Sequence, residues 1–190
     1  MNTLQSTAQQ NWRDTMTVWQ MAEVMQIGPL LENNGSLRNK IYSWPNTSSC
    51  AVDQDVVLAE QGNYNISSRT ASRKGLDALE YLLFNPNLEH SCTVFGTEPA
   101  GWNNRSDNAR QLARCQFAEL VATELVNDGQ QVVDAWTGES GYAQLLKNAG
   151  EVGSTYQDIH DAVNEISDAL FYIDTVTKDA KLATPLGIFA

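Results

Sequence analysis

Two carboxylates three residues apart, Asp77 and Glu80, are the side chains of this sequence best placed to do chemistry. They lie within residues 73–84, which read as a helix, and positions i and i+3 of a helix are surface neighbours about 5–6 Å apart. Two acids this close repel each other unless a cation, a shared proton or a basic partner compensates. Because Gly75 precedes the pair and the apolar run 81–84 follows it, we expect the helix to be buried and Glu80 to be partly buried.

Three interpretations of this pair remain open. In the first, both residues are solvated acids on a helix surface. In the second, Arg73 and Lys74 neutralise Asp77 through helical neighbour pairing, with Arg73 at the i, i+4 position. In the third, Asp77 and Glu80 are metal ligands, and such oxygen ligands favour hard cations (iron, Ca²⁺, Mn²⁺ or Mg²⁺) over zinc or copper.

The familiar catalytic constellations are absent from the sequence. His90 and His160 are the only histidines, so an H-E-x-x-H zinc site is excluded. Neither histidine has a glutamate three residues before it, as the paired motifs of di-iron bundles require. Nucleophile elbows, phosphate-binding loops and dinucleotide glycine motifs are also missing. Without a recognisable nucleophile–base pair, a binding function is favoured over an enzymatic one.

The composition is acidic, with a net charge of −11 and 18% charged residues in a chain of 190. Such a surface repels nucleic-acid phosphates, and no cluster of lysine and arginine offers an exception, so we expect no nucleic-acid partner. No apolar run approaches 18 residues, and we expect no transmembrane helix. The first residues do not resemble a signal peptide, whereas abundant Asn, Gln, Ser and Thr with few lysines favour an exported domain whose signal has been removed.

Three cysteines leave one without a partner if a disulfide forms. Cys92 and Cys115 flank a loop-like segment rich in glycine and asparagine. A bridge between them would fasten this loop to the next helix and stabilise the fold by about 3 kcal/mol. If the protein is exported, we expect this bridge, and Cys50 then has no partner within the chain. The alternative is that all three cysteines are reduced thiols.

Apolar residues recur with the helical period along most of the chain, and almost no segment alternates with period two. The sequence therefore predicts an all-α helical bundle. We expect helices within residues 12–27, 51–60, 73–84, 106–136, 142–148 and 156–176, and an irregular connection over 28–50. Ser72 and Ser106 are the expected helix caps, and the long helix either continues past Gly129 or restarts there. One core is expected to contain Trp12, Trp19, Leu79, Leu82, Leu83, Phe117 and Val121.

Residues 150–154 are the best candidate for a domain boundary. They divide the chain into a first helical bundle, residues 1–150, and the first helix of a second, incomplete bundle, residues 151–190. The apolar stripe from Ile159 to Val176 has no later helix to cover it, and exposed apolar faces usually mark interaction surfaces. We expect a missing C-terminal half or a second chain to cover the helix of residues 156–180.

Several motifs in matching order resemble the imelysin family of bacterial cell-envelope proteins, also called M75 peptidases. Gly75, Asp77 and Glu80 resemble its G-x-H-x-x-E motif, with Asp77 in place of the histidine. Ile41-Tyr42-Ser43-Trp44-Pro45 with Val52-Asp53 resembles its IYSWP…VD segment. Residues 169–174, 178–182 and 184–187 resemble the opening helix of its second domain and the segment after it. Together these matches cover about residues 10–190.

The resemblance implies a protein of the periplasm or cell envelope, lipid-anchored in its full form and linked to iron uptake. It also implies that Trp44 and Asp53 neighbour the motif, while Asp77 in place of histidine argues against metal chemistry that needs an imidazole there. We expect a binding protein for iron or another metal, with a site at Asp77 and Glu80 near the domain interface. The alternatives are an M75-type peptidase, as the family name implies, and a structural or partner-binding helical protein.

Overall fold

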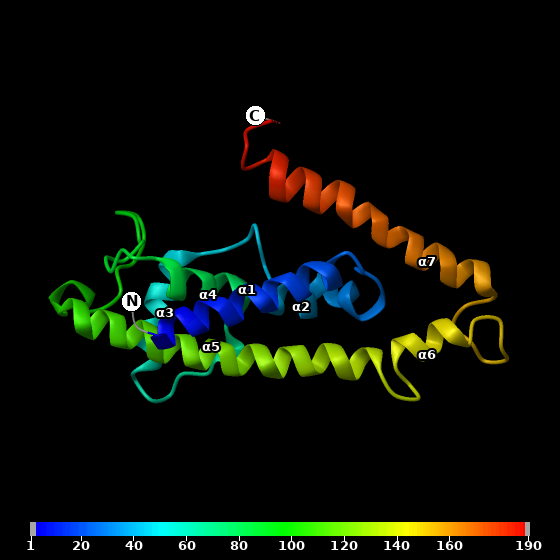
Figure 1. Cartoon of the computed structure of the whole chain (residues 1–190), viewed down its shortest axis with the longest axis horizontal. Coiled ribbons are helices and arrows are strands. Elements are labelled where there is room, and N and C mark those ends of the chain that lie inside the picture. Colours follow the sequence, from blue (N-terminus) through cyan, green and yellow to red (C-terminus); the bar gives the residue numbers. More distant parts are fainter. Residues whose placement is uncertain (1–2, 189–190) are drawn as a thin grey trace. The chain divides into compact units, whose positions relative to one another are not determined.

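The computed structural model describes residues 3–188 and contains no strand in that range, which confirms the expected all-α fold (Figure 1). Its α-helices are α1 (Thr3–Glu23), α2 (Glu32–Ile41), α3 (Ser49–Ala59), α4 (Gly75–Phe84), α5 (Asp107–Trp136), α6 (Tyr142–Lys147) and α7 (Ile159–Tyr172). Short 3₁₀ turns lie at η1 (Gly28–Leu30), η2 (Ile66–Ser68), η3 (Ala71–Arg73) and η4 (Trp102–Asn104). Helix α7 continues into a π-helical segment, η5 (Ile173–Ala183).

The chain forms two compact units that are discontinuous in sequence. The first combines residues up to Met16 with Asn39–Asp128, and the second combines Thr17–Arg38 with residues from Gly129 onward. Helices α1, α2 and α5 therefore contribute residues to both units. The domain boundary expected at residue 150 stays a prediction. Within residues 3–188, no helix is long and apolar enough to cross a membrane.

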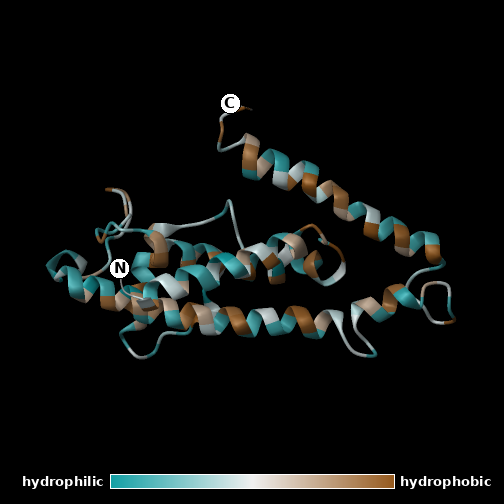
Figure 2. Ribbon diagram, in the orientation of Figure 1, coloured by the Kyte–Doolittle hydropathy of each residue, from teal (hydrophilic) through white to brown (hydrophobic). Residues whose placement is uncertain are grey.

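The first unit has an apolar core formed by α3, α4 and α5. Hydrophobic and polar residues intermingle along α5 (Figure 2). Its buried side combines apolar residues with charged ones: Ala113, Phe117, Ala118 and Val121, and Arg110, Arg114, Glu124 and Asp128. Of the residues expected in one core, Leu79, Phe117 and Val121 are buried in it, and Trp12, Leu82 and Leu83 pack against it. Trp19 is also buried, but it belongs to the second unit, so its assignment to the same core is wrong.

Most of the predicted helices are confirmed. Helix α5 runs without interruption through Gly129, and the Ser106 Oγ accepts a hydrogen bond from the Ala109 N–H near its start at 3.3 Å. The connection over residues 28–50 is more helical than expected because it contains α2. Asn33 and Asn34 at the start of α2 adopt left-handed backbone angles, with φ of 50° and 59°. Asparagine tolerates these angles and is common in turns. The Asn-rich sequence therefore predicts an irregular connection and does not reveal the helix that follows it.

The second unit holds α7 and η5 through a buried carboxylate. The Tyr172 hydroxyl donates a hydrogen bond to Glu23 Oε1 at 2.5 Å, and Lys181 forms an ion pair with the same oxygen. The buried side of α7 consists of small or amphipathic residues, including Ala169, which packs with Ile27. The helix therefore packs within its unit without using its aliphatic stripe.

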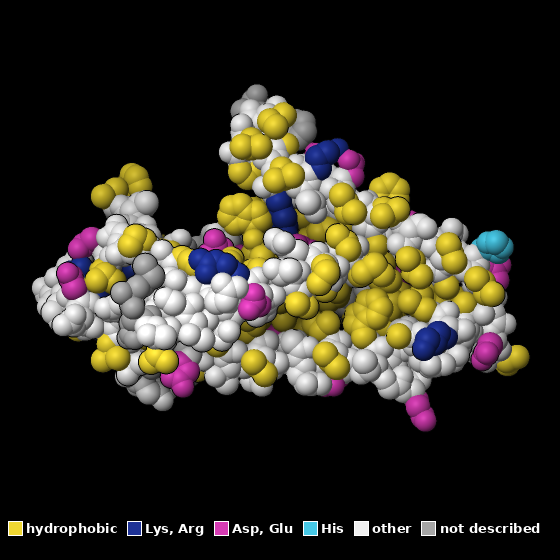
Figure 3. Space-filling view, in the orientation of Figure 1, with side chains coloured by type: hydrophobic (Ala, Val, Ile, Leu, Met, Phe, Trp, Pro, Cys, Tyr) yellow, Lys and Arg dark blue, Asp and Glu magenta, His cyan; other side chains and the backbone are white. Residues whose placement is uncertain are grey.

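That stripe remains exposed, as the sequence predicted. Ile159 is 69% exposed and Leu170 is 65% exposed, with Val163 and Ile166 between them also exposed. Figure 3 shows hydrophobic side chains on the surface of this segment. What covers the stripe stays a prediction.

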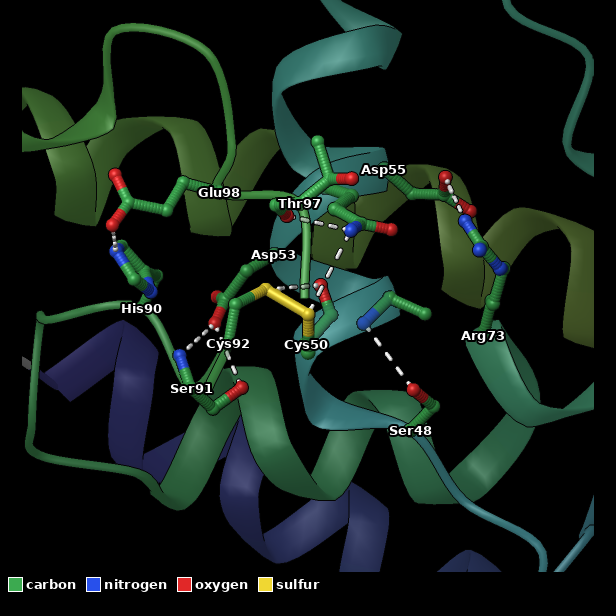
Figure 4. Close-up of a disulfide and its surroundings, with 12 residues drawn as sticks. Ser48, Cys50, Asp53, Asp55, Arg73, His90, Ser91, Cys92, Thr97 and Glu98 are labelled. Atoms are coloured by element: carbon green, nitrogen blue, oxygen red, sulfur yellow. Dashed lines mark hydrogen bonds and ion pairs between the residues drawn. A yellow bond between two sulfur atoms is a disulfide. The ribbon is translucent and has the colours of Figure 1, made fainter. Parts of the chain in front are cut away.

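The expected Cys92–Cys115 disulfide is wrong, because Cys92 is bonded to Cys50 (Figure 4). Cys50 lies in the first turn of α3, and its Cα is 4.4 Å from that of Cys92. Cys115 is a free, exposed thiol. It lies on α5 between two buried positions, Arg114 and Phe117, but on the outward side of the helix. Sequence separation could not identify this pairing because three cysteines allow three different bridges.

Candidate functional site

Gly75 allows α4 to begin very close to another segment of the first unit. Its φ is +78°, and a Cβ built on it would lie 2.7 Å from the carbonyl oxygens of both Lys40 and Ile41. Only glycine tolerates this combination of backbone angle and close contact. The expected cap by Ser72 is not observed, because Lys74 occupies the N-cap position and makes no side-chain capping bond. The motif glycine therefore positions the start of the helix.

Asp77 is buried and fixes the segment that carries Trp44. Its Oδ2 accepts hydrogen bonds from the Ser43 backbone N–H at 2.8 Å and from the Ser43 hydroxyl at 2.7 Å. Ser43 is itself buried and directly precedes Trp44. A carboxylate with two such bonds is a strong acceptor, so Asp77 determines where the neighbouring indole lies.

Glu80 lies one helical turn further along α4, and its side chain is exposed rather than partly buried as expected. It makes no hydrogen bond or ion pair with any other residue of the range 3–188. Partial desolvation, and then the negative charge of Asp77, raise the pKa of Glu80. The site thus contains one anchored carboxylate and one carboxylate available to a ligand.

Both carboxylates line a cleft of about 300 Å³ in the first unit. One group of lining residues is aromatic: Trp44, Tyr81 and Phe84. A second group carries hydroxyls: Thr47, Ser48, Ser49 and Ser72. Val52, Ala78 and Asn85 complete the lining. The predicted residues Trp44, Asp77 and Glu80 are therefore brought together, whereas Gly75 and Asp53 do not line the cleft.

The two basic residues before the motif face other carboxylates. Arg73 forms an ion pair with Asp55 at 2.8 Å. The buried Lys74 forms one with Glu124 at 3.2 Å. The predicted pairing of these cations with Asp77 is therefore wrong as the explanation of the acidic pair. Helical neighbour spacing failed here because Arg73 and Lys74 precede the first residue of α4.

Asp53 does not line the cleft but positions Tyr81, which does. Its fully buried carboxylate accepts hydrogen bonds from the Tyr81 hydroxyl at 2.7 Å, the Ser91 N–H at 2.8 Å and Arg114 at 2.9 Å. Burial raises the pKa of Tyr81, so this phenol stays protonated and donates to Asp53. Asp53 thereby orients one aromatic wall of the cleft and also holds the loop that follows α4.

Sequence reasoning missed the hydroxyl side of the cleft. Ser48 is the N-cap of α3, and its Oγ accepts from the Ala51 N–H at 3.3 Å. A serine before an apolar helix is a recognisable cap signal, and it would have placed Thr47 and Ser49 at the same helix end. No comparable local signal reveals the bond between Ser43 and Asp77, which are 34 residues apart.

The acidic and hydroxyl side chains of this cleft are suited to contact a positively charged group. The carboxylates and hydroxyls are hard oxygen donors, which suit ammonium groups and hard metal ions. Within residues 3–188, however, no group of three or more His, Cys, Asp or Glu residues is arranged to hold a metal ion. The residues that line the cleft include neither histidine nor cysteine.

Within residues 3–188 the protein is thus all-α and has a carboxylate-lined cleft at a G-x-D-x-x-E motif. The sequence model of the imelysin family (peptidase M75) matches residues 2–188, so the chain belongs to this family. Comparisons with curated proteins and with solved structures gave no significant match.

Proposed function

We propose that this imelysin-family protein is a cell-envelope binding protein that holds a cation in the cleft at Asp77 and Glu80. The observation that carries the proposal is the Glu80 carboxylate, which lines the cleft without a hydrogen bond or ion pair to any residue of the range 3–188. Desolvation opposes its negative charge, and a bound cation would relieve that cost. Iron and other hard metal ions are the first cations to test, in keeping with a role in metal uptake.

One further feature supports the envelope location, and another supports the binding of cations. The Cys50–Cys92 disulfide suits an oxidising compartment such as the periplasm. The net charge of −11 would attract cations towards the protein over distances of about 10 Å at moderate ionic strength. Neither feature depends on the identity of the ligand.

Binding explains the cleft better than peptide hydrolysis does. Hydrolysis needs an activated nucleophile or a metal-bound water, and a serine nucleophile needs a base within hydrogen-bonding distance. The cleft hydroxyl of Ser48 is committed to capping α3, and the described histidines lie elsewhere, with His90 facing Glu98. The peptidase alternative therefore has no support from the geometry of this cleft.

Calorimetric titration tests the proposal. Mn²⁺, Ca²⁺ and ferric citrate are titrated separately into the wild type and into the Asp77→Asn/Glu80→Gln variant. The control is Asp134→Asn/Glu139→Gln, which removes the same charge from exposed positions of the second unit. We expect binding that only the cleft variant loses and that weakens below about pH 5, where protons compete for the carboxylates. Equal heats for all three proteins with every ion would refute a metal ligand.

A second part of the proposal concerns the exposed stripe of α7. We propose that a second chain covers residues 156–180, because aliphatic faces of this kind usually mark interaction surfaces. Sedimentation of the wild type should show concentration-dependent association that Val163→Ser/Leu170→Ser abolishes. An exposed apolar residue in the first unit, Leu112, provides the control variant Leu112→Ser. A wild type that stays monomeric at every concentration would contradict association through this face.

A further inference from the structure

The cleft at Asp77 and Glu80 has the size and lining of a site for a small molecule rather than for a bare ion. Its volume of about 300 Å³ is roughly ten times the share of one water molecule in the liquid. It also lies at the lower end of the range typical of small-molecule pockets. A single metal ion would leave most of this space to water, whereas a compact organic group would displace it.

The cleft has only two carboxylates in its lining, and within residues 3–188 no third acidic, histidine or cysteine side chain joins them to hold a metal ion. Ca²⁺ requires six to eight oxygens, and Mg²⁺ requires near-ideal octahedral geometry. Asp77 and Glu80 are the acidic residues of the lining, and Asp77 Oδ2 already accepts two hydrogen bonds from Ser43. A metal ion would have to compete with Ser43 for that oxygen.

The aromatic lining suits the remainder of an organic cation. Trp44 is 37% exposed and lines the cleft, so part of its surface is open to a ligand. By contrast, Arg13 lies over the Phe84 ring at 4.9 Å, and Arg114 lies over the Tyr81 ring at 5.0 Å. The indole is therefore the aromatic surface best placed to receive a cation or the carbon chain beside it.

We infer that the cleft binds an organic cation, a primary ammonium or guanidinium group on a short carbon stem. The charged group pairs with the Glu80 carboxylate, and the stem lies against Trp44. The hydroxyls of Thr47 and Ser49 provide neutral hydrogen-bonding partners around the charged group. This assignment rests on the proposed function, because it narrows the ligand of the same cleft from cations in general to one chemical class.

A ligand-observed NMR titration at neutral pH tests the inference with probes of defined chemistry. The probes are benzylammonium, methylguanidinium and benzyl alcohol, which has the size of benzylammonium but no charge. We expect the two cations to bind and benzyl alcohol not to bind. Glu80→Gln should weaken binding of the cations by about 10-fold or more, since it removes a charge-assisted hydrogen bond. Trp44→Ala should weaken it by about 3-fold to 10-fold through loss of the cation–π contact.

Two control variants separate the cleft from general effects. Glu139→Gln removes one exposed charge from the second unit, and Phe171→Ala removes one exposed ring there. Both should bind the probes as the wild type does. Because Glu80 is exposed and makes no bond to residues 3–188, Glu80→Gln is expected to fold normally, and circular dichroism verifies this. Trp44→Phe keeps a ring at the cleft and should retain more affinity than Trp44→Ala.

The possible results distinguish this inference from the proposed function. Binding of the organic cations that Glu80→Gln abolishes would support both. Equal binding of benzyl alcohol, or unchanged affinity in Glu80→Gln, would overturn the organic cation. Calorimetric binding of metal ions alone, dependent on Asp77 and Glu80, would overturn the organic cation and leave the proposed function standing. Failure of every cation to bind would overturn both.

Discussion

Replacing Gly75 by alanine perturbs the junction where α4 meets the end of α2. The new methyl group would lie 2.7 Å from the carbonyl oxygens of Lys40 and Ile41, a distance that backbone atoms must shift to relieve. The residue would also have to keep a φ of +78°, which side chains disfavour. The substitution therefore imposes both a conformational cost and a steric cost.

The structure separates these two costs through glycines in other environments. Gly62 has a φ of +80°, and a methyl group there would have no atom within 4 Å, so Gly62→Ala carries the conformational cost alone, about 1–2 kcal/mol. Gly129 lies within α5, also with open space around it, so Gly129→Ala should stabilise the protein by about 0.5–1 kcal/mol. Gly75→Ala adds about 1–3 kcal/mol of overlap to the conformational cost, which gives about 2–5 kcal/mol in total.

Chemical denaturation followed by circular dichroism measures the free energy of unfolding of each variant. The expected order of stability is Gly129→Ala, wild type, Gly62→Ala and then Gly75→Ala. Ligand affinity supplies a second measurement, because displacing the end of α2 should also move Trp44 and weaken binding in the cleft. If Gly75→Ala costs no more than Gly62→Ala, the close approach of α4 to the Lys40 and Ile41 carbonyls is refuted.

Three further tests address other parts of the structure. Replacing Cys50 and Cys92 by serine should lower the free energy of unfolding by about 4 kcal/mol, because the bridge closes a loop of 42 residues. Cys115→Ser should leave denaturation unchanged, and equal losses in both proteins would contradict the Cys50–Cys92 pairing. Glu80→Gln should raise the melting temperature at neutral pH, because a raised pKa means that the folded state disfavours the ionised carboxyl. The gain should disappear below the ordinary pKa of 4.5, where Glu80 is protonated in both states, and a gain independent of pH would contradict this cause. Asp77→His should be less stable than Asp77→Asn by about 1–3 kcal/mol, since an imidazole has one acceptor nitrogen for two buried donors. Thermal denaturation of both variants checks this, and equal stability would show that the two accepted bonds matter little.

Much of the fold could be predicted because helical periodicity is a local property. The helical period along α5 places Phe117 and Val121 on its buried side, and the structure agrees. The apolar run of residues 81–84 after Glu80 is only partly buried, and the buried part of α4 precedes it. Periodicity says nothing about which segments share a compact unit. The prediction that Trp19 is buried is correct, but its assignment to the core of the first unit is wrong, because α1 contributes residues to both units.

The candidate site was only partly predictable because its residues have partners far away in sequence. The motif identified Asp77 and Glu80, but spacing alone assigned Arg73 to Asp77 although its partner is Asp55. The disulfide was missed for the same reason, since Cys50 and Cys92 meet only after α3 and the loop following α4 have packed. Long-range contacts such as these depend on the whole fold, and a single sequence carries no direct record of them.

The motif residues have separate structural tasks, and this separation determines how the cleft can bind. Gly75 has no side chain and so allows the end of α2 to approach α4 closely. Asp77 accepts two hydrogen bonds from Ser43 and thereby positions the neighbouring Trp44. A ligand that took the Oδ2 of Asp77 would have to displace two hydrogen bonds, whereas a ligand at Glu80 would replace only water. Affinity should therefore depend on Glu80 for the charge of the ligand and on Asp77 for the position of the indole. A single positive charge beside an aromatic ring fits this division better than a metal ion that needs both carboxylates at once.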